Sequence, residues 1–353
     1  TGIAVGAAVL NRVTAVFPDV DARRALTSAM AGLFMSAAHV DEVEREADLE
    51  RAMATLLPDV DANVRGTLGA MLAMNEGKDA DDVDFSTFGP AFFAGGTDHE
   101  DVMPRGGYRP VVEHLAGGLD VRTGQAVRQI VEDADGVTVH TASGTFTGTH
   151  AIVTVPLGVL KAGAIEVDPE LPAAHTAAIN RVGFGALEKV VLAYERAVWQ
   201  VDGSPIHVTI VDAPRPAWPV ILDLSTWYGT PVVVGMATGD HGRALAAMPE
   251  AERVAALHET ICELGGPDTP DPIGFATTSW ATDPFLLGCY ANIAPGTDPA
   301  QHAIDVAALA TPHGRVLFAG EHTCRRGTST VDSAWITGVR EASRLLQSQT
   351  VLL

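Results

Sequence analysis

The residues best suited to chemistry lie near the end of the chain, where Gly320 and Glu321 follow a short apolar stretch. Residues 316–319 predict a buried strand, and a polar loop and a long terminal helix come after it. A glycine lets the backbone approach a ligand closely, and a helix start offers unpaired N–H groups with a partial positive charge. The segment therefore suits a cofactor with hydroxyls at one end and an electron-rich carbonyl at the other.

A second candidate is Lys189, which lies in a strand-like run of apolar residues and is one of only three lysines in the chain. It shares a predicted strand face with Leu187, Val191 and Ala193, so its ammonium group has apolar neighbours. Two interpretations are open. Lys189 is either an edge-strand lysine that extends to water, or a functional lysine whose pKa is lowered by burial.

A third candidate is the loop from Trp280 to Tyr290, which holds an aromatic pair, a turn and a glycine. Such aromatic residues often serve core packing. Their ring faces also attract an amine cation, which is the functional alternative.

These segments, in this order, resemble the flavin-containing amine oxidases, a family that includes monoamine oxidases, polyamine oxidases and histone lysine demethylases. The resemblance covers roughly residues 99–350 and implies FAD as the cofactor. It implies that Lys189 is catalytic and holds a water against flavin N5. It also implies a substrate cage formed by Trp280, Tyr290 and Thr330.

The resemblance further implies a set of cofactor-binding residues. Val127 matches the residue whose backbone receives the adenine, and Gly320 and Glu321 match the turn and the acid near the ribityl chain. Thr330 and Val331 begin the last helix, and the Val331 amide is expected to face the flavin O2 region. The positive end of that helix would stabilise negative charge on the reduced flavin.

Cys289 carries two competing interpretations. Monoamine oxidases have a cysteine just before the matching tyrosine and join it to the flavin through a thioether, which makes Cys289 a candidate covalent link. Polyamine oxidases bind FAD without such a bond, and the pair Thr330 and Val331 resembles their version. The alternative is a small, inert, buried cysteine.

The chain lacks the Gly-x-Gly-x-x-Gly fingerprint with which the family begins. The nearest match, Gly183-Phe-Gly185, has no third glycine and leads into a strand instead of a helix. We therefore expect a chain without its N-terminal βαβ unit, which normally cradles the pyrophosphate. His and Cys spacings indicate no metal site.

The overall composition of the chain excludes some classes of binding partner. The net charge of −21 argues against nucleic acid and anionic membranes as partners. Three cysteines fit a reducing compartment and a cytoplasmic location, and no apolar run reaches the length of a membrane span. The expected partners are a small-molecule amine and O2, and the oligomeric state is left open, with a homodimer as one alternative.

The predicted fold class is α/β (α+β): a Rossmann-like FAD/NAD(P)-binding domain without its N-terminal βαβ unit, interleaved with a substrate domain of mixed sheet and helices. Residues 1–98 and 161–300 are assigned to the substrate domain, and 99–160 and 301–353 to the FAD domain. The expected strands and helices lie at residues 119–122, 127–132, 136–141, 145–147, 150–155 and 273–279, and at 110–116 and 250–264.

The resulting functional prediction is FAD-dependent oxidation of a monoamine or polyamine to an imine, with hydride transfer to flavin N5 and reduction of O2 to H2O2. Two alternatives remain. One is a non-catalytic fragment that cannot hold FAD alone. The other is a flavin oxidoreductase of the same fold that acts on amino acids or other substrates.

Overall fold

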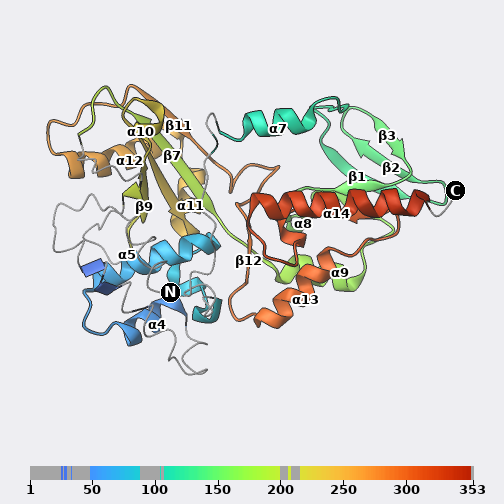
Figure 1. The fold of residues 1–353 in the computed structure, drawn as a ribbon, viewed down its shortest axis with the longest axis horizontal. Coiled ribbons are helices and arrows are strands. Elements are labelled where there is room, and N and C mark those ends of the chain that lie inside the picture. The colour runs from blue at the N-terminus through green and yellow to red at the C-terminus, as the bar shows by residue number, and fades with distance from the viewer. Residues whose placement is uncertain are drawn as a thin grey trace.

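The computed structural model describes residues 48–87, 104, 107–198, 206–207 and 215–350, with a few isolated positions between 25 and 33. These residues form two lobes that meet in the middle of the molecule (Figure 1). The predictions made for residues 1–24 and 88–98 lie outside the described residues.

The first lobe is built on an antiparallel sheet with strand order β11-β7-β10-β9-β8. Its strands are β7 (Leu187–Ala193), β8 (Ile206–His207), β9 (Val220–Asp223), β10 (Val232–Thr238) and β11 (Gly274–Thr277). In β7, Val190 and Leu192 are fully buried and pack with Trp218 and with Leu257 of α12 (Glu250–Gly265). Two further helices, α10 (Ser225–Tyr228) and α11 (Gly239–Ala247), complete this part of the lobe.

A separate helical core completes the first lobe. It contains α4 (Leu49–Leu56) and α5 (Ala62–Ala73), with the short 3₁₀ turns η1 (Met74–Glu76), η2 (Ala80–Asp82) and η3 (Phe85–Thr87). The carboxylates of Asp48 and Asp61 accept hydrogen bonds from backbone N–H groups in the first turns of α4 and α5. Leu49, Leu68 and Phe85 lie in its core.

The second lobe carries a four-stranded sheet of order β3-β2-β1-β5 and a parallel pair. Its strands are β1 (Val127–Glu132), β2 (Val137–Thr141), β3 (Thr145–Gly148) and β5 (Glu166–Asp168), and the parallel pair is β4 (Ala151–Val153) with β13 (Val316–Phe318). Its helices are α7 (Arg109–Ala116), α8 (Leu157–Lys161), α9 (Ala173–Arg181), α13 (Pro299–Leu309) and α14 (Val331–Thr350), and the 3₁₀ turn η4 (Glu321–Thr323) follows β13.

A two-stranded ribbon lies between the lobes (Figure 1). It pairs β6 (Gly183–Phe184) with β12 (Ala291–Asn292) in antiparallel register. Strand β6 of the ribbon leads into β7, and strand β12 follows the loop of Trp280 and Tyr290. Both β7 and that loop therefore begin or end near the boundary of the two lobes.

The mixed α/β fold agrees with the prediction, and the strand at residues 127–132 is confirmed to the residue. The strand predicted at residues 119–122 is wrong, because that stretch has no regular structure. Leu119 and Val121 are 68% and 63% exposed, and glycines with positive φ stand at 118 and 124. A β-prone stretch with no neighbouring strand to cover it gains nothing from an extended pairing.

Several helices were not predicted, among them α9 and α13. α9 begins directly after Pro172, and α13 begins at Pro299 behind an Asp298 cap whose carboxylate accepts from the Ala300 N–H. Proline at or before the first helical position is a recognised start signal. Within the described part of the chain, no helix is long and apolar enough to span a bilayer.

Two buried histidines lie next to strand β13 of the parallel pair. His175 is 4% exposed and its ring lies 4.6 Å from that of Phe318, while His322 is 2% exposed. Burial, together with the nearby Arg340 and His175, lowers the pKa of His322 to about 4. Both imidazoles are therefore neutral in the folded protein near neutral pH.

This pair predicts loss of stability in acid. The pKa of His322 is about 6.5 in the unfolded chain and about 4 in the fold, so the unfolded state binds more protons between those values. The contribution of His322 is complete above pH 6.5 and falls by about 3 kcal/mol as the pH approaches 4. A urea-unfolding series from pH 7.5 to 4.5 should show a shallower acid dependence for His322→Gln than for the parent chain. His114→Gln, on an exposed position of α7, is the control and should reproduce the parent curve.

Candidate functional site

Lys189 stands on β7 with its ammonium group against the Trp280 ring. The Nζ atom lies 5.3 Å from the ring centroid, within the range of a cation–π interaction. Its backbone N–H donates to the Thr278 hydroxyl at 2.8 Å. Burial lowers the pKa of Lys189. The structure thus brings together the predicted catalytic lysine and one predicted cage residue.

Glu188, the residue beside Lys189, belongs to the opposite face of the strand and was missed in the sequence. It is fully buried, and its two carboxylate oxygens accept hydrogen bonds from the Thr278 hydroxyl and the Ala281 N–H. The available signal was an acidic residue in phase with the apolar positions Val190 and Leu192.

Tyr290 and Cys289 face the helical part of the first lobe. The Tyr290 hydroxyl donates to the carbonyl of Met74, and Cys289 and Tyr290 both pair through their backbones with Gly185. A Cβ built on Gly77 would come within 2.7 Å of the Cys289 sulfur, so the thiol packs closely on that glycine. Burial raises the pKa of Cys289 to about 12, which keeps it a thiol.

Glu321 ties three segments of the chain together. Its Oε1 accepts from the Ala291 N–H at 3.1 Å, directly after Tyr290, and its Oε2 accepts from the Ser329 N–H at 2.6 Å. The Ser329 hydroxyl in turn donates to the Ala291 carbonyl. Burial raises the pKa of Glu321, and these two N–H groups oppose that shift.

Gly320 occupies a position that requires glycine. Its φ is +135°, and a Cβ there would stand 2.6 Å from the His322 ring. The Thr337 hydroxyl of α14 bonds to both its N–H and its carbonyl, at 3.0 and 3.1 Å. The end of β13 is therefore held to the helix that follows it.

Thr330 and Val331 form the start of α14, as expected. The Thr330 hydroxyl accepts from the Ser333 N–H at 3.3 Å, and Ser329 before it has a positive φ of 73°. Val331 is 60% exposed. The first turn of a helix has N–H groups without intrahelical acceptors, so this end can receive an electron-rich ligand atom.

Val127 lies apart from this group, at the start of β1 in the four-stranded sheet. It pairs with Thr141 and is partly buried against the core of the second lobe. Its assignment to the adenine stays a prediction.

These residues fit one end of a flavin. The glycine with positive φ, the acid next to it and the open first turn of α14 form a cradle at the boundary of the lobes, and Glu321 links it to the loop of Tyr290. These residues would hold the ribityl and pyrimidine portions, while Lys189 and Trp280 would serve the reacting side. The 353 residues contain no Gly-x-Gly-x-x-Gly motif for the pyrophosphate.

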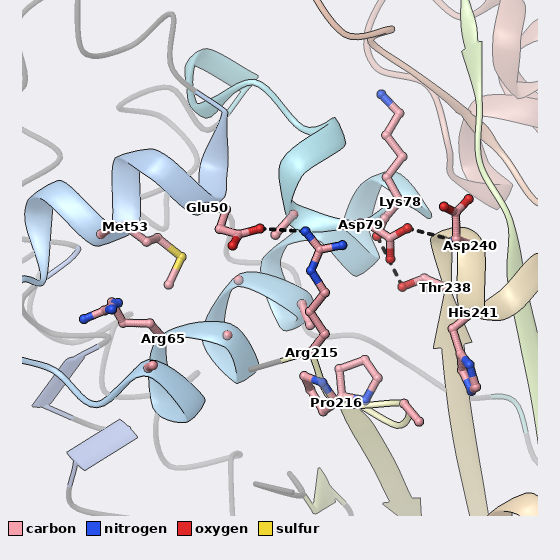
Figure 2. A pocket seen from close by; sticks show the side chains of 18 residues that line it. Glu50, Met53, Arg65, Lys78, Asp79, Arg215, Pro216, Thr238, Asp240 and His241 are labelled. Atoms are coloured by element: carbon pink, nitrogen blue, oxygen red, sulfur yellow. Dashed lines mark hydrogen bonds and ion pairs between the residues drawn. The ribbon is translucent and has the colours of Figure 1, made fainter. Parts of the chain in front are cut away.

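A cavity of about 360 Å³ lies elsewhere in the first lobe, between α4, α5 and the end of β10 (Figure 2). Arg215 closes one side by pairing with Glu50 and Asp81, and Asp79 accepts from the Asp240 N–H at 2.8 Å. None of the predicted site residues lines it, and Arg65 and Lys78 in its wall donate to backbone carbonyls. Among the residues that the structure describes, no cluster suited to a metal ion is present.

Comparison with protein families finds one whose description is flavin-containing amine oxidoreductase, and it matches residues 21–346. A rice (Oryza sativa subsp. japonica) protein named lysine-specific histone demethylase 1 homolog 1 is 35% identical over 248 residues, covering 69% of this chain and 29% of the relative. Human lysine-specific histone demethylase 2 is 33% identical over 261 residues, covering 72% and 31%. Rice polyamine oxidase 4 is 33% identical over 239 residues, covering 67% and 47%. The chain thus spans less than half of each of these relatives.

Solved structures share the fold. A putrescine oxidase bound to putrescine superposes with a TM-score of 0.72 over 94% of this chain and 77% of that one, at 19% identity. Cyclohexylamine oxidase from Brevibacterium oxydans gives a TM-score of 0.67 over 95% and 77%, also at 19% identity. At such low identity the likeness concerns the fold.

The bonds of Glu321 lead to a stability prediction. Glu321→Ala leaves the Ala291 and Ser329 N–H groups without their acceptor, which should lower the free energy of unfolding by about 1 to 3 kcal/mol. Hydrogen exchange should accelerate at residues 289–292 and 327–331 and stay unchanged in β9 and β10. Glu321→Gln keeps one carbonyl oxygen and should lose less. Equal exchange in all three proteins would contradict the role given to this carboxylate.

Proposed function

We propose that this chain, which belongs to the flavin-containing amine oxidoreductase family, provides the substrate side and part of the cofactor side of an FAD-dependent amine oxidase. FAD is the cofactor that family membership implies. The observation that carries the proposal is the half-buried Lys189 ammonium against the Trp280 ring, on the strand that leads away from the lobe boundary.

Bound FAD would supply the two-electron chemistry that oxidises a neutral amine to its protonated imine and passes the electrons to O2 as H2O2. Lys189 would hold a water at the reacting face, and the lowering of its pKa by burial would make its amine easier to deprotonate. Trp280 and Tyr290 would shape the substrate side and exclude bulk water. The first turn of α14 would face the developing negative charge.

Further parts of the proposal concern organisation. Residues 1–98 and 161–300 would form the substrate domain, and 99–160 and 301–353 the FAD domain. A small amine is the proposed substrate, in line with the names of the polyamine oxidase and putrescine oxidase relatives.

The absence of a Gly-x-Gly-x-x-Gly motif from the 353 residues favours a second candidate for the chain by itself, a fragment that holds FAD weakly or not at all. FAD titration of the purified chain, followed by flavin fluorescence, decides between the two. Stoichiometric 450 nm absorbance in the purified chain would refute the fragment interpretation.

Replacing the lysine tests the catalytic assignment. In the longest native polypeptide that contains this chain, Lys189→Met should slow flavin reduction and reoxidation on the order of 100-fold, because the organised water and its proton exchange are lost. Stopped-flow absorbance with an amine and then O2 measures both steps. Lys161→Met is the control, since Lys161 donates to the Asn180 carbonyl, away from the site, and should leave both rates unchanged. Unchanged rates in Lys189→Met would sink the assignment.

The packing of Cys289 predicts non-covalent FAD. Its sulfur packs against Gly77, and burial raises its pKa to about 12, so it is a poor nucleophile. Acid precipitation of the flavin-loaded protein should leave all yellow colour in the supernatant, and Cys289→Ser should keep its flavin content. Colour retained in the pellet of the parent but absent from the pellet of Cys289→Ser would establish the thioether instead.

A further inference from the structure

Glu188 is an acid placed in an apolar layer of β7. Alternate residues of the strand point to one face, and Glu188, Val190, Leu192 and Tyr194 on that face are all 0% exposed. A buried carboxylate is costly unless hydrogen bonds compensate for the lost water. Such a residue therefore needs hydrogen-bond donors at fixed positions, and the donors identify the segment that the carboxylate holds in place.

Both donors come from the segment that carries Trp280. The Thr278 hydroxyl donates to Glu188 Oε2 at 2.5 Å, and the Ala281 N–H donates to Oε1 at 2.8 Å. The same hydroxyl accepts from the Lys189 N–H at 2.8 Å. A threonine hydroxyl has a single proton, so accepting from Lys189 leaves that proton for Glu188.

The carboxylate thus binds the chain on both sides of Trp280. The segment is also closed by a bond from the Gly288 N–H to the Trp280 carbonyl at 3.1 Å. With residues 278 and 281 both attached to one buried group, the indole between them has little freedom to leave Lys189. The ring centroid lies 5.3 Å from Nζ.

We propose that Glu188 is a positioning residue, which fixes Trp280 over the Lys189 ammonium by clamping both sides of the tryptophan. It touches neither the amine substrate nor the flavin in this assignment. Its relevance to catalysis rests on the proposed function, whereas the clamp itself belongs to the fold and can be measured without cofactor or substrate.

The scarcity of lysine provides a direct probe. Reductive methylation with ¹³C-formaldehyde converts Lys78, Lys161 and Lys189 into dimethylamines with separate NMR signals, which Lys→Arg variants assign. The Trp280 ring should shift the Lys189 methyl signal upfield, and a pH titration of each signal reports the protonation of its amine. Trp280→Leu gives the value for a lysine without the ring.

In Glu188→Ala we expect the Lys189 signal to move most of the way to its Trp280→Leu position. Its titration midpoint should also change towards the Trp280→Leu value, because the ring no longer covers the amine. Glu188→Gln retains a carbonyl acceptor and should stay close to the parent. Thr278→Val, nearly isosteric, removes one arm of the clamp and should give an intermediate shift, which keeps the test valid if Glu188→Ala does not fold.

The control is Glu341→Ala, which removes another fully buried carboxylate, one that pairs with Arg340 and Arg344 in the second lobe. It should lower stability and leave the Lys189 signal in place. A folded Glu188→Ala or Thr278→Val protein with an unmoved Lys189 signal and midpoint would overturn the clamp. A clamp confirmed by NMR together with normal turnover of Lys189→Met would instead refute the proposed function alone.

Discussion

A buried carboxylate must find hydrogen-bond donors, and this constraint organises the irregular parts of the molecule on which the site depends. Glu188 is fully buried and Glu321 partly buried; both accept hydrogen bonds from backbone N–H groups, and each carboxylate joins segments that are distant in sequence. Residues 278 and 281 are thereby bonded to β7, and residues 291 and 329 to the turn that follows β13.

Glu188 lies in the first lobe and Glu321 in the second, one on each side of the lobe boundary. Each lobe has its own apolar core, and the ribbon of β6 and β12 passes between them. Tyr290 bonds to the carbonyl of Met74 and Cys289 packs on Gly77, so the aromatic loop is also attached to the helical part of the first lobe. The candidate site consequently depends on contacts from the sheet of the first lobe, from its helical part and from the second lobe. This explains why its residues are spread over the sequence.

The sequence was sufficient to predict the elements whose own residues carry a recognisable pattern. The strand of Val127–Glu132, the helix of Glu250–Gly265 and the helix start at Val331 follow from turn residues, apolar periodicity and a preceding polar loop. The nearness of Lys189 and Trp280 was also implied, through the family resemblance. Glu188 was missed because its partners lie about 90 positions away. Residues 119–122 were wrongly assigned because strand formation depends on a neighbour that a local pattern does not reveal.

The exposed apolar side chains of the second lobe have a consequence for the behaviour of the chain in solution. Leu119, Val331 and Trp335 are each more than half exposed, on segments that Figure 1 places in the same lobe. They favour association between copies, whereas a net charge of −21 opposes it. Salt shortens the range of that repulsion from about 30 Å at 0.01 M to about 8 Å at 0.15 M and leaves the apolar attraction intact. Higher salt therefore weakens the repulsion between copies of this acidic protein, while their exposed apolar side chains remain available for contact.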